Sequence, residues 1–76
     1  MHPTVIILPL TLELHDAPLF RVTVRGGART GLLRDSQIMV DKVTTVPRAR
    51  IGTRVGKVDA PTLQAVDQAL RGFLGL

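Results

Sequence analysis

The sequence predicts a mainly β domain that is closed by one C-terminal α-helix. Short runs in which apolar and polar residues alternate are separated by glycine and proline, and helical spacing replaces this alternation only near the C-terminus. Aromatic residues make up 3% of the chain and cysteine is absent, so the core must be built from Val, Ile and Leu, which favours strands. Seventy-six residues support one domain, which we expect to cover residues 1–76.

The first predicted strand is the almost continuous apolar run Thr4–Leu8, which Pro9 ends. Because such a strand needs cover on both faces, we expect it to be central, with a neighbour on each edge. We expect one of these neighbours to lie upstream of the run. The run is too short to span a membrane and the chain has no cysteine, so we expect a cytoplasmic protein without a membrane partner.

Residues 19–25 form the clearest half-buried strand of the chain. Arg21 lies on its polar side, while Val22 and Val24 lie on the other side, as in an antiparallel strand with one buried face. The glycine-rich stretch 26–31 then predicts a hairpin or a long basic loop. It does not match a phosphate-binding loop, because another strand rather than a helix follows it.

The stretch 36–50 predicts a further strand, because β-branched residues recur with a period near two until Pro47, where the strand should end. Residues 51–58 predict a short edge strand, which Gly52 and Gly56 weaken.

A C-terminal helix is predicted to begin after Asp59, a residue type that caps helices, with Pro61 in its first turn and Gly75 at its end. Its polar residues face away from an apolar stripe. We expect this stripe to belong to the core, and it contains Leu63, Val66, Leu70, Phe73 and Leu74.

Positive charge is the main functional signal in the composition. Ten Lys and Arg against six Asp and Glu give a formal charge of +4. Eight of the ten basic residues are Arg, whose guanidinium binds phosphate oxygens in a fork. The end of the 36–50 stretch combines Thr44 with Arg48 and Arg50, which would offer a hydroxyl and positive charge to a phosphodiester. A solvated basic turn is the ordinary alternative.

Other chemistries lack their usual residue patterns. His2 and His15 have no metal-ligand spacing, and Ser36 does not lie in a nucleophile elbow, so we expect no metal, no cofactor and no serine catalysis. General acid–base work by Thr, Arg and Asp remains open. That set suits RNA cleavage, in which the substrate's own 2′-OH attacks while the protein positions and neutralises the phosphate.

Several sequence blocks resemble one known family. In order they read VIILPLT, DAPLFRVTV, SQIMVDKVTTVPR and VGKVD, followed by a helix that ends FLGL. Their order and spacing are similar to those of the MazF/PemK/Kid toxins of type II toxin–antitoxin modules over nearly all of the chain. The resemblance implies a twisted, SH3-like toxin barrel of antiparallel strands with a C-terminal helix, of which this chain would form a partial version.

The resemblance also implies an activity and partners. Such toxins are homodimeric, metal-independent endoribonucleases that cut single-stranded mRNA without a cofactor and are held in check by a cognate antitoxin. Thr11 matches the threonine of the family's P-x-T-S block, and Asp41 and Lys42 match its D-Q block. We therefore expect Thr11 to be catalytic, and we expect the RNA to be bound by Arg21, Asp41, Lys42, Thr44, Arg48 and Arg50.

The chain departs from the family pattern in three places. The usual R-G-D/E-I strand and the G-x-x-R-P loop with its catalytic arginine are absent, Leu12 replaces a serine, and Thr44 replaces a basic residue. The chain is thus expected to resemble roughly the C-terminal two thirds of such a toxin. One alternative is an impaired homologue that binds antitoxin, a toxin partner or nucleic acid without cleavage. Another, gyrase poisoning, relies on a tryptophan that this chain lacks.

Overall fold

The computed structural model of the chain describes residues 3–14 and 20–76. Within these ranges the chain forms short strands followed by one long helix, which confirms the predicted mainly β fold class with a C-terminal helix. In chain order, the elements are β1 (Thr4–Ile7), β2 (Leu10–Thr11), β3 (Arg21–Val24), β4 (Ser36–Met39), the 3-10 helix η1 (Val40–Lys42), β5 (Thr44–Pro47), the 3-10 helix η2 (Arg48–Arg50) and α1 (Ala60–Leu74).

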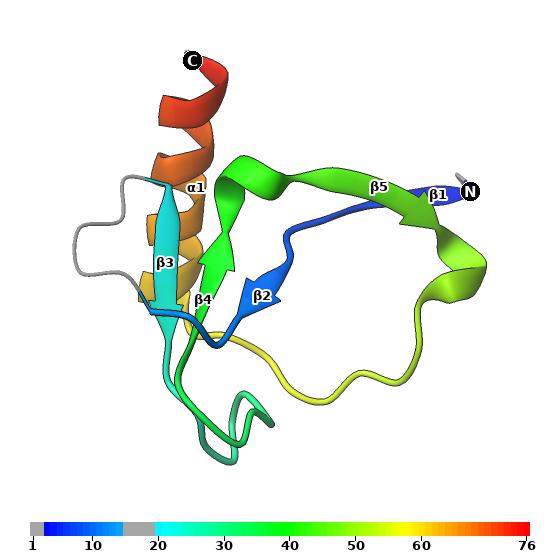
Figure 1. Cartoon of the computed structure of the whole chain (residues 1–76), viewed down its shortest axis with the longest axis vertical. Coiled ribbons are helices and arrows are strands. Elements are labelled where there is room, and N and C mark those ends of the chain that lie inside the picture. The colour runs from blue at the N-terminus through cyan, green and yellow to red at the C-terminus, as the bar shows by residue number, and fades with distance from the viewer. Residues whose placement is uncertain (1–2, 15–19) are drawn as a thin grey trace.

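The strands pair antiparallel in two small sheets (Figure 1). One sheet has the order β2-β4-β3, and the other is a ribbon of β1 and β5. In the first sheet, Gln37 of β4 lies between Thr11 of β2 and Thr23 of β3. In the ribbon, Thr4 pairs with Pro47. The chain passes from β4 through η1 into β5, so the ribbon extends away from the three-stranded sheet (Figure 1).

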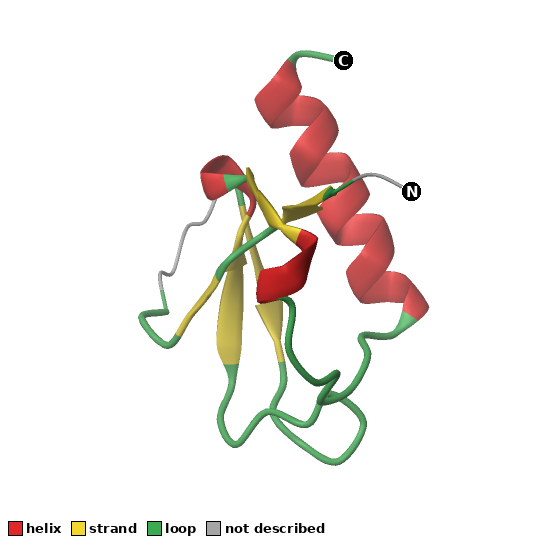
Figure 2. Cartoon of the chain, turned by 90° about the vertical axis from the view of Figure 1, so that its right-hand side faces the viewer, coloured by secondary structure: helices red, strands yellow, loops and turns green. Residues whose placement is uncertain are grey.

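Helix α1 packs along β3 and η1 (Figure 2). Its N-terminus is capped by Asp59, whose carboxylate accepts a hydrogen bond from the Thr62 backbone N–H at 3.0 Å and from the Thr62 hydroxyl at 2.5 Å. Its C-terminus is closed by Gly75 at φ 77°, a left-handed conformation that favours glycine. Both predicted helix ends are confirmed. Of the helices in the described ranges, none has the length and apolarity needed to cross a membrane.

The core is small and lies between α1 and the three-stranded sheet. Its buried members are Val24, Ile38 and Val40. The ring of Phe20 meets that of Phe73 edge-on, with centroids 5.3 Å apart, and so fastens the last turns of α1. Partly buried side chains surround the centre, namely Leu8, Phe20, Val22, Leu32, Val58, Val66, Ala69 and Leu70.

The prediction that the whole apolar stripe of α1 belongs to the core is only partly right. Val66 and Leu70 pack against the core, but Leu63 and Leu74 are exposed. The helix has fifteen residues, whereas β3 and β4 have four each. The strands are therefore too short to cover both ends of the stripe.

Among the described residues, residues 4–8 have one of the two predicted strand neighbours, and the upstream neighbour stays a prediction. Within the described residues, β1 pairs only with β5, and β2 pairs only with β4. The chain changes sheets at Pro9, which has no N–H to donate but whose carbonyl accepts a hydrogen bond from the Met39 N–H at 2.8 Å. Among the described strands, β1 before Pro9 and β2 after it therefore both lie at sheet edges.

The stretch 36–50 is not one strand either. It turns through η1 because Val40, which is wholly buried, directs the chain into the core, and its N–H donates to the Phe20 carbonyl at 2.9 Å. The predicted end at Pro47 is confirmed. Residues 51–58, predicted as an edge strand, belong to no sheet, although the Lys57 N–H donates to the Arg29 carbonyl at 2.9 Å.

We expect replacement of Asp59 by alanine to lower the melting temperature at neutral pH, because both Thr62 hydrogen bonds are lost. These bonds, assisted by the charge of Arg29, hold the pKa of Asp59 below its ordinary value of 3.8. A depressed pKa means that the carboxylate stabilises the fold fully above pH 3.8 and loses that contribution as the pH falls through its folded pKa. The melting temperatures of the original protein and the alanine variant should converge as the pH is lowered from 7 into the acid range. A difference in melting temperature that does not change with pH would contradict this.

Candidate nucleic-acid interface

The sheet face opposite α1 carries a row of polar side chains. Side chains alternate between faces along a strand, so the core positions Val24 and Ile38 place Thr23 and Gln37 on the other face. Thr11 joins this row through its pairing with Gln37. Gln37 is buried and donates from Nε2 to the Thr23 hydroxyl at 3.4 Å, which fixes the centre of the row.

Thr11 and Arg21, two residues predicted from the sequence, are brought together at this face. The Thr11 hydroxyl accepts a hydrogen bond from the Glu13 N–H at 3.1 Å, and Arg21 Nη1 donates to the Glu13 carbonyl at 3.5 Å. Residue Glu13 thus links a hydroxyl on β2 to a guanidinium on β3. A contact of 3.5 Å is weak, and a guanidinium has five donors, so Arg21 keeps the capacity to bind an anion beside Thr11.

The other predicted contact residues lie on different elements. Asp41 and Lys42 belong to η1, at the turn between the three-stranded sheet and the ribbon. Thr44 begins β5, and Arg48 and Arg50 form η2 at the far end of the ribbon, where the Arg48 N–H donates to the Pro3 carbonyl at 2.7 Å. All five side chains are exposed. The structure therefore distributes them along the ribbon and does not gather them around Thr11.

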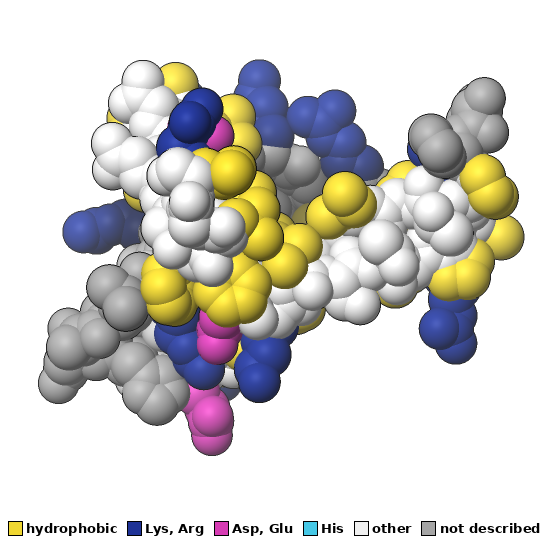
Figure 3. All heavy atoms as spheres, turned by 90° about the horizontal axis from the view of Figure 1, so that it is seen from above, with side chains coloured by type: hydrophobic (Ala, Val, Ile, Leu, Met, Phe, Trp, Pro, Cys, Tyr) yellow, Lys and Arg dark blue, Asp and Glu magenta, His cyan; other side chains and the backbone are white. Residues whose placement is uncertain are grey.

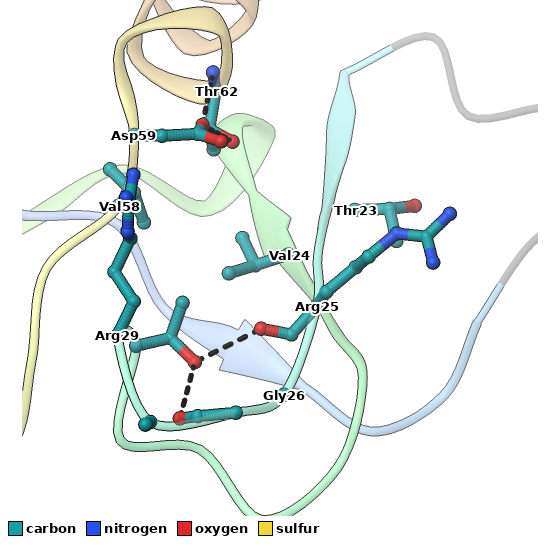
Figure 4. Close-up of a pocket in the computed structure, with 11 residues that line it drawn as sticks. Thr23, Val24, Arg25, Gly26, Arg29, Val58, Asp59 and Thr62 are labelled. Carbon is teal, nitrogen blue, oxygen red and sulfur yellow. Dashed lines mark hydrogen bonds between the residues drawn. The ribbon is translucent and has the colours of Figure 1, made fainter.

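A hollow of about 360 Å³ lies between the glycine-rich loop and the start of α1 (Figure 4). The Thr30 hydroxyl donates to the Arg25 carbonyl at 3.0 Å and so ties the loop across its neck. In Figure 4 the Arg25 side chain points away from Asp59, whereas Arg29 extends along the wall towards the start of the helix. Charges of both signs line this hollow, and none of the predicted site residues does.

On the face that Figure 3 shows, positive charge is spread out and not concentrated in one patch. Figure 3 shows Lys and Arg side chains at several separate places around the visible face. In residues 3–14 and 20–76, no three His, Cys, Asp or Glu side chains are grouped as metal ligands would be. Both histidines that the sequence raised as possible ligands, His2 and His15, lie outside the described residues.

Sequence reasoning missed Gln37 and Glu13. Gln37 is a polar residue in the 36–39 strand, which is buried on both faces. The available signal was that alternation along the strands places Gln37 on the same face as the threonines. Glu13 acts through its backbone groups, and no side-chain pattern reports such a role.

Comparison with protein families and with curated relatives gives consistent matches. A sequence model described as PemK-like, MazF-like toxin of type II toxin–antitoxin system matches residues 1–74. A probable endoribonuclease MazF from Mycolicibacterium smegmatis is 41% identical over 73 residues. That match covers 96% of this chain and 67% of the relative, so the chain spans about two thirds of the relative's length.

Solved structures share the fold. The Mycobacterium tuberculosis toxin MazF-mt6 superposes with a TM-score of 0.86 and 24% identity, over 99% of this chain and 73% of the toxin. An endoribonuclease in complex with its cognate antitoxin, from a mycobacterial species, superposes with a TM-score of 0.79 and 23% identity, over 99% of this chain and 68% of that one.

Proposed function

Because this chain belongs to the PemK-like, MazF-like toxin family of type II toxin–antitoxin systems, we propose that it cleaves single-stranded RNA as a metal-independent endoribonuclease. The observation that carries this proposal is the connection of Thr11 and Arg21 through Glu13. RNA cleavage needs little covalent chemistry from the protein when the 2′-OH is the nucleophile. It needs a fixed donor and a fixed positive charge at the phosphate.

In the proposed reaction the RNA lies across the polar face with its scissile phosphate beside Thr11 and Arg21. The ribose 2′-oxygen forms a bond to phosphorus as its proton passes to water, and the bond from phosphorus to the 5′-oxygen breaks as that oxygen takes up a proton. The products are a 2′,3′-cyclic phosphate and a 5′-hydroxyl end. Arg21 stabilises the charge on the non-bridging oxygens, and the Thr11 hydroxyl donates to one of them, since its oxygen already accepts from Glu13.

The exposed residues along η1, β5 and η2 would bind the flanking nucleotides. Lys42, Arg48 and Arg50 supply positive charge along the ribbon, while Asp41 and Thr44 can hydrogen-bond to bases or ribose. Contacts of this kind release counterions, so RNA affinity should fall as salt rises.

We propose that residues 1–76 act as a single domain, in a cytoplasmic homodimer that is inhibited by a cognate antitoxin. The solved complex of a mycobacterial endoribonuclease with its antitoxin supports the choice of partner. A second function, binding of antitoxin or RNA without cleavage, is favoured by one observation: most of the predicted contact residues lie along η1, β5 and η2 and not around Thr11.

The proposed function is tested by incubating the purified chain with a long single-stranded RNA, with and without EDTA. We expect cleavage that EDTA leaves unchanged and that yields cyclic phosphate ends. A matched RNA with 2′-O-methyl groups throughout should stay intact, because it lacks the nucleophile. Cleavage of the methylated RNA, or loss of cleavage in EDTA, would contradict the mechanism. Intact RNA together with salt-sensitive RNA binding would assign the second function.

A further inference from the structure

The buried amide of Gln37 and the exposed hydroxyl of Thr23 form a pair that the proposed reaction does not use. Gln37 lies in the central strand of the three-stranded sheet and is 2% exposed, whereas Thr23, its partner on β3, is exposed. Gln37 Nε2 donates to the Thr23 hydroxyl oxygen at 3.4 Å. Because a buried amide that loses a hydrogen bond costs free energy, this contact restrains a side chain at the protein surface.

The pair sets the direction of the Thr23 hydroxyl hydrogen. An amide nitrogen is a donor only, so the Thr23 oxygen must be the acceptor and its single hydrogen must point elsewhere. Thr23 is β-branched and lies in a strand, so its χ1 angle is restricted as well. Figure 4 shows the side chains of Thr23 and the core residue Val24 on opposite sides of β3. The exposed end of the pair is therefore a hydrogen-bond donor on the polar face.

Thr23 lies too far from Thr11 for both to contact the scissile phosphate. The two threonines pair with Gln37 from opposite neighbouring strands, so two strand spacings, about 10 Å, separate them. Hydrogen bonds are about 3 Å long, so one phosphate does not reach both hydroxyls. Arg21 lies two residues before Thr23 on the same face of β3, roughly 7 Å away. An RNA whose phosphate lies beside Thr11 and Arg21 therefore presents a neighbouring nucleotide to Thr23.

A hydroxyl donor at this position distinguishes bases by one functional group. Uracil and guanine carry a carbonyl oxygen at the edge where cytosine and adenine carry an amino group. A carbonyl oxygen accepts the Thr23 hydrogen, whereas an amino group places hydrogen against hydrogen. A contact to a phosphate or ribose oxygen would make no such distinction.

We propose that Thr23 is a specificity-determining residue that selects a keto base, uracil or guanine, beside the scissile phosphate, and that Gln37 is the positioning residue that directs its hydroxyl. The inference rests on the proposed passage of RNA across the polar face and adds a sequence preference to it. Thr23 donates to the base carbonyl, while Gln37 donates to Thr23 and does not touch the RNA. One neutral hydrogen bond of this kind supports about a three- to tenfold preference.

Binding of RNA that cannot be cleaved tests the inference separately from the reaction. Oligomers of about eight nucleotides, with 2′-O-methyl groups throughout, are made from uridine alone or from cytidine alone. They differ only in the carbonyl or amino group of the base and in the ring nitrogen beside it. We expect the chain to bind the uridine oligomer about three- to tenfold more tightly in fluorescence anisotropy. Equal affinities, or binding of neither oligomer, would overturn the inference.

Variants of the pair assign the preference to its members. Thr23→Val should lower the affinity for the uridine oligomer to that for the cytidine oligomer, which should not change, and Thr23→Ser should keep the preference. Gln37→Met replaces the amide with an apolar side chain of similar length and should also remove the preference, although Thr23 keeps its hydroxyl. Thr45→Val is the matched control, because Thr45 is an exposed strand threonine on the ribbon, and it should change neither affinity.

The outcomes separate this inference from the proposed function. A preference that survives in Thr23→Val overturns the inference, and so does an equal loss of both affinities, which would mean a contact to the RNA backbone. A preference that survives in a folded Gln37→Met protein overturns the positioning role of Gln37. If that variant does not fold, the exposed Thr23 variants still decide. Cleavage without a base preference would refute this inference alone, whereas a chain that cleaves no RNA can still be tested by binding.

Discussion

Replacing Arg21 with glutamine is expected to slow RNA cleavage by about 10²–10³-fold while leaving the melting temperature nearly unchanged. The Arg21 guanidinium is connected to Thr11 through Glu13. In the proposed transition state it faces the negative charge that develops on the phosphate oxygens. Glutamine keeps a donor of similar length but carries no charge. Single-turnover cleavage of a labelled RNA by the two proteins measures the ratio.

Arg25→Gln is the matched control for Arg21→Gln. Arg25 follows the same strand and is exposed, and its side chain extends beside Thr23 (Figure 4), but the hydrogen bond to the Glu13 carbonyl is made by Arg21. We expect it to change cleavage by less than about threefold. Thr11→Val should lower the rate to a level that Arg21→Gln scarcely lowers further, because groups that act on one phosphate are not additive. If the two substitutions instead lowered the cleavage rate by independent factors that multiply, Thr11 and Arg21 would act at different steps of the reaction.

Gly31→Ala is expected to destabilise the fold by about 2–4 kcal/mol, a large share of the stability of a domain this small. Gly31 has φ +73°, and a Cβ at this position would lie 2.1 Å from the Val55 carbonyl oxygen. Alanine would therefore be strained itself and would also push residue 55 away from the loop. Urea unfolding followed by circular dichroism measures the loss.

The control for Gly31→Ala is Gly52→Ala. Gly52 has no atom within 4 Å of a built Cβ and no left-handed φ. Alanine at this position should be neutral or slightly stabilising, by up to about 1 kcal/mol, because it restricts the unfolded chain. If both variants lost the same stability, the left-handed conformation of Gly31 and its close approach to Val55 would not explain the effect.

Features with local causes were predictable from the sequence. The helix from Asp59 to Gly75 was predicted at both ends, because a capping carboxylate and a left-handed glycine act on neighbouring residues. Residues 26–31 were predicted to form a hairpin or a long basic loop, and they lie in the connection between the antiparallel strands β3 and β4. The alternation of residues 19–25 correctly placed Val24 in the core.

Features that depend on distant partners were not predictable. The apolar run at residues 4–8 was expected to have a strand on each side, but among the described residues β1 pairs with β5 alone, and the chain changes sheets at Pro9 to pair β2 with β4. The turn at Val40 follows from the burial of one side chain, which alternation does not report. The proximity of Thr11 and Arg21 likewise rests on pairing across β4 and on backbone groups of Glu13, so their joint role stays a proposal tested above.

The arrangement of the β1–β5 ribbon has a consequence for the order of folding. Strands β3 and β4 are joined by a short connection, whereas Thr4 must find Pro47 across most of the chain. Closing that larger loop costs more chain entropy, so we expect the hairpin and α1 to form first and the ribbon last. The ribbon contacts little of the core, so it should also open most often in the native state. The backbone amides of residues 44–46 should then exchange with solvent faster than those of β4.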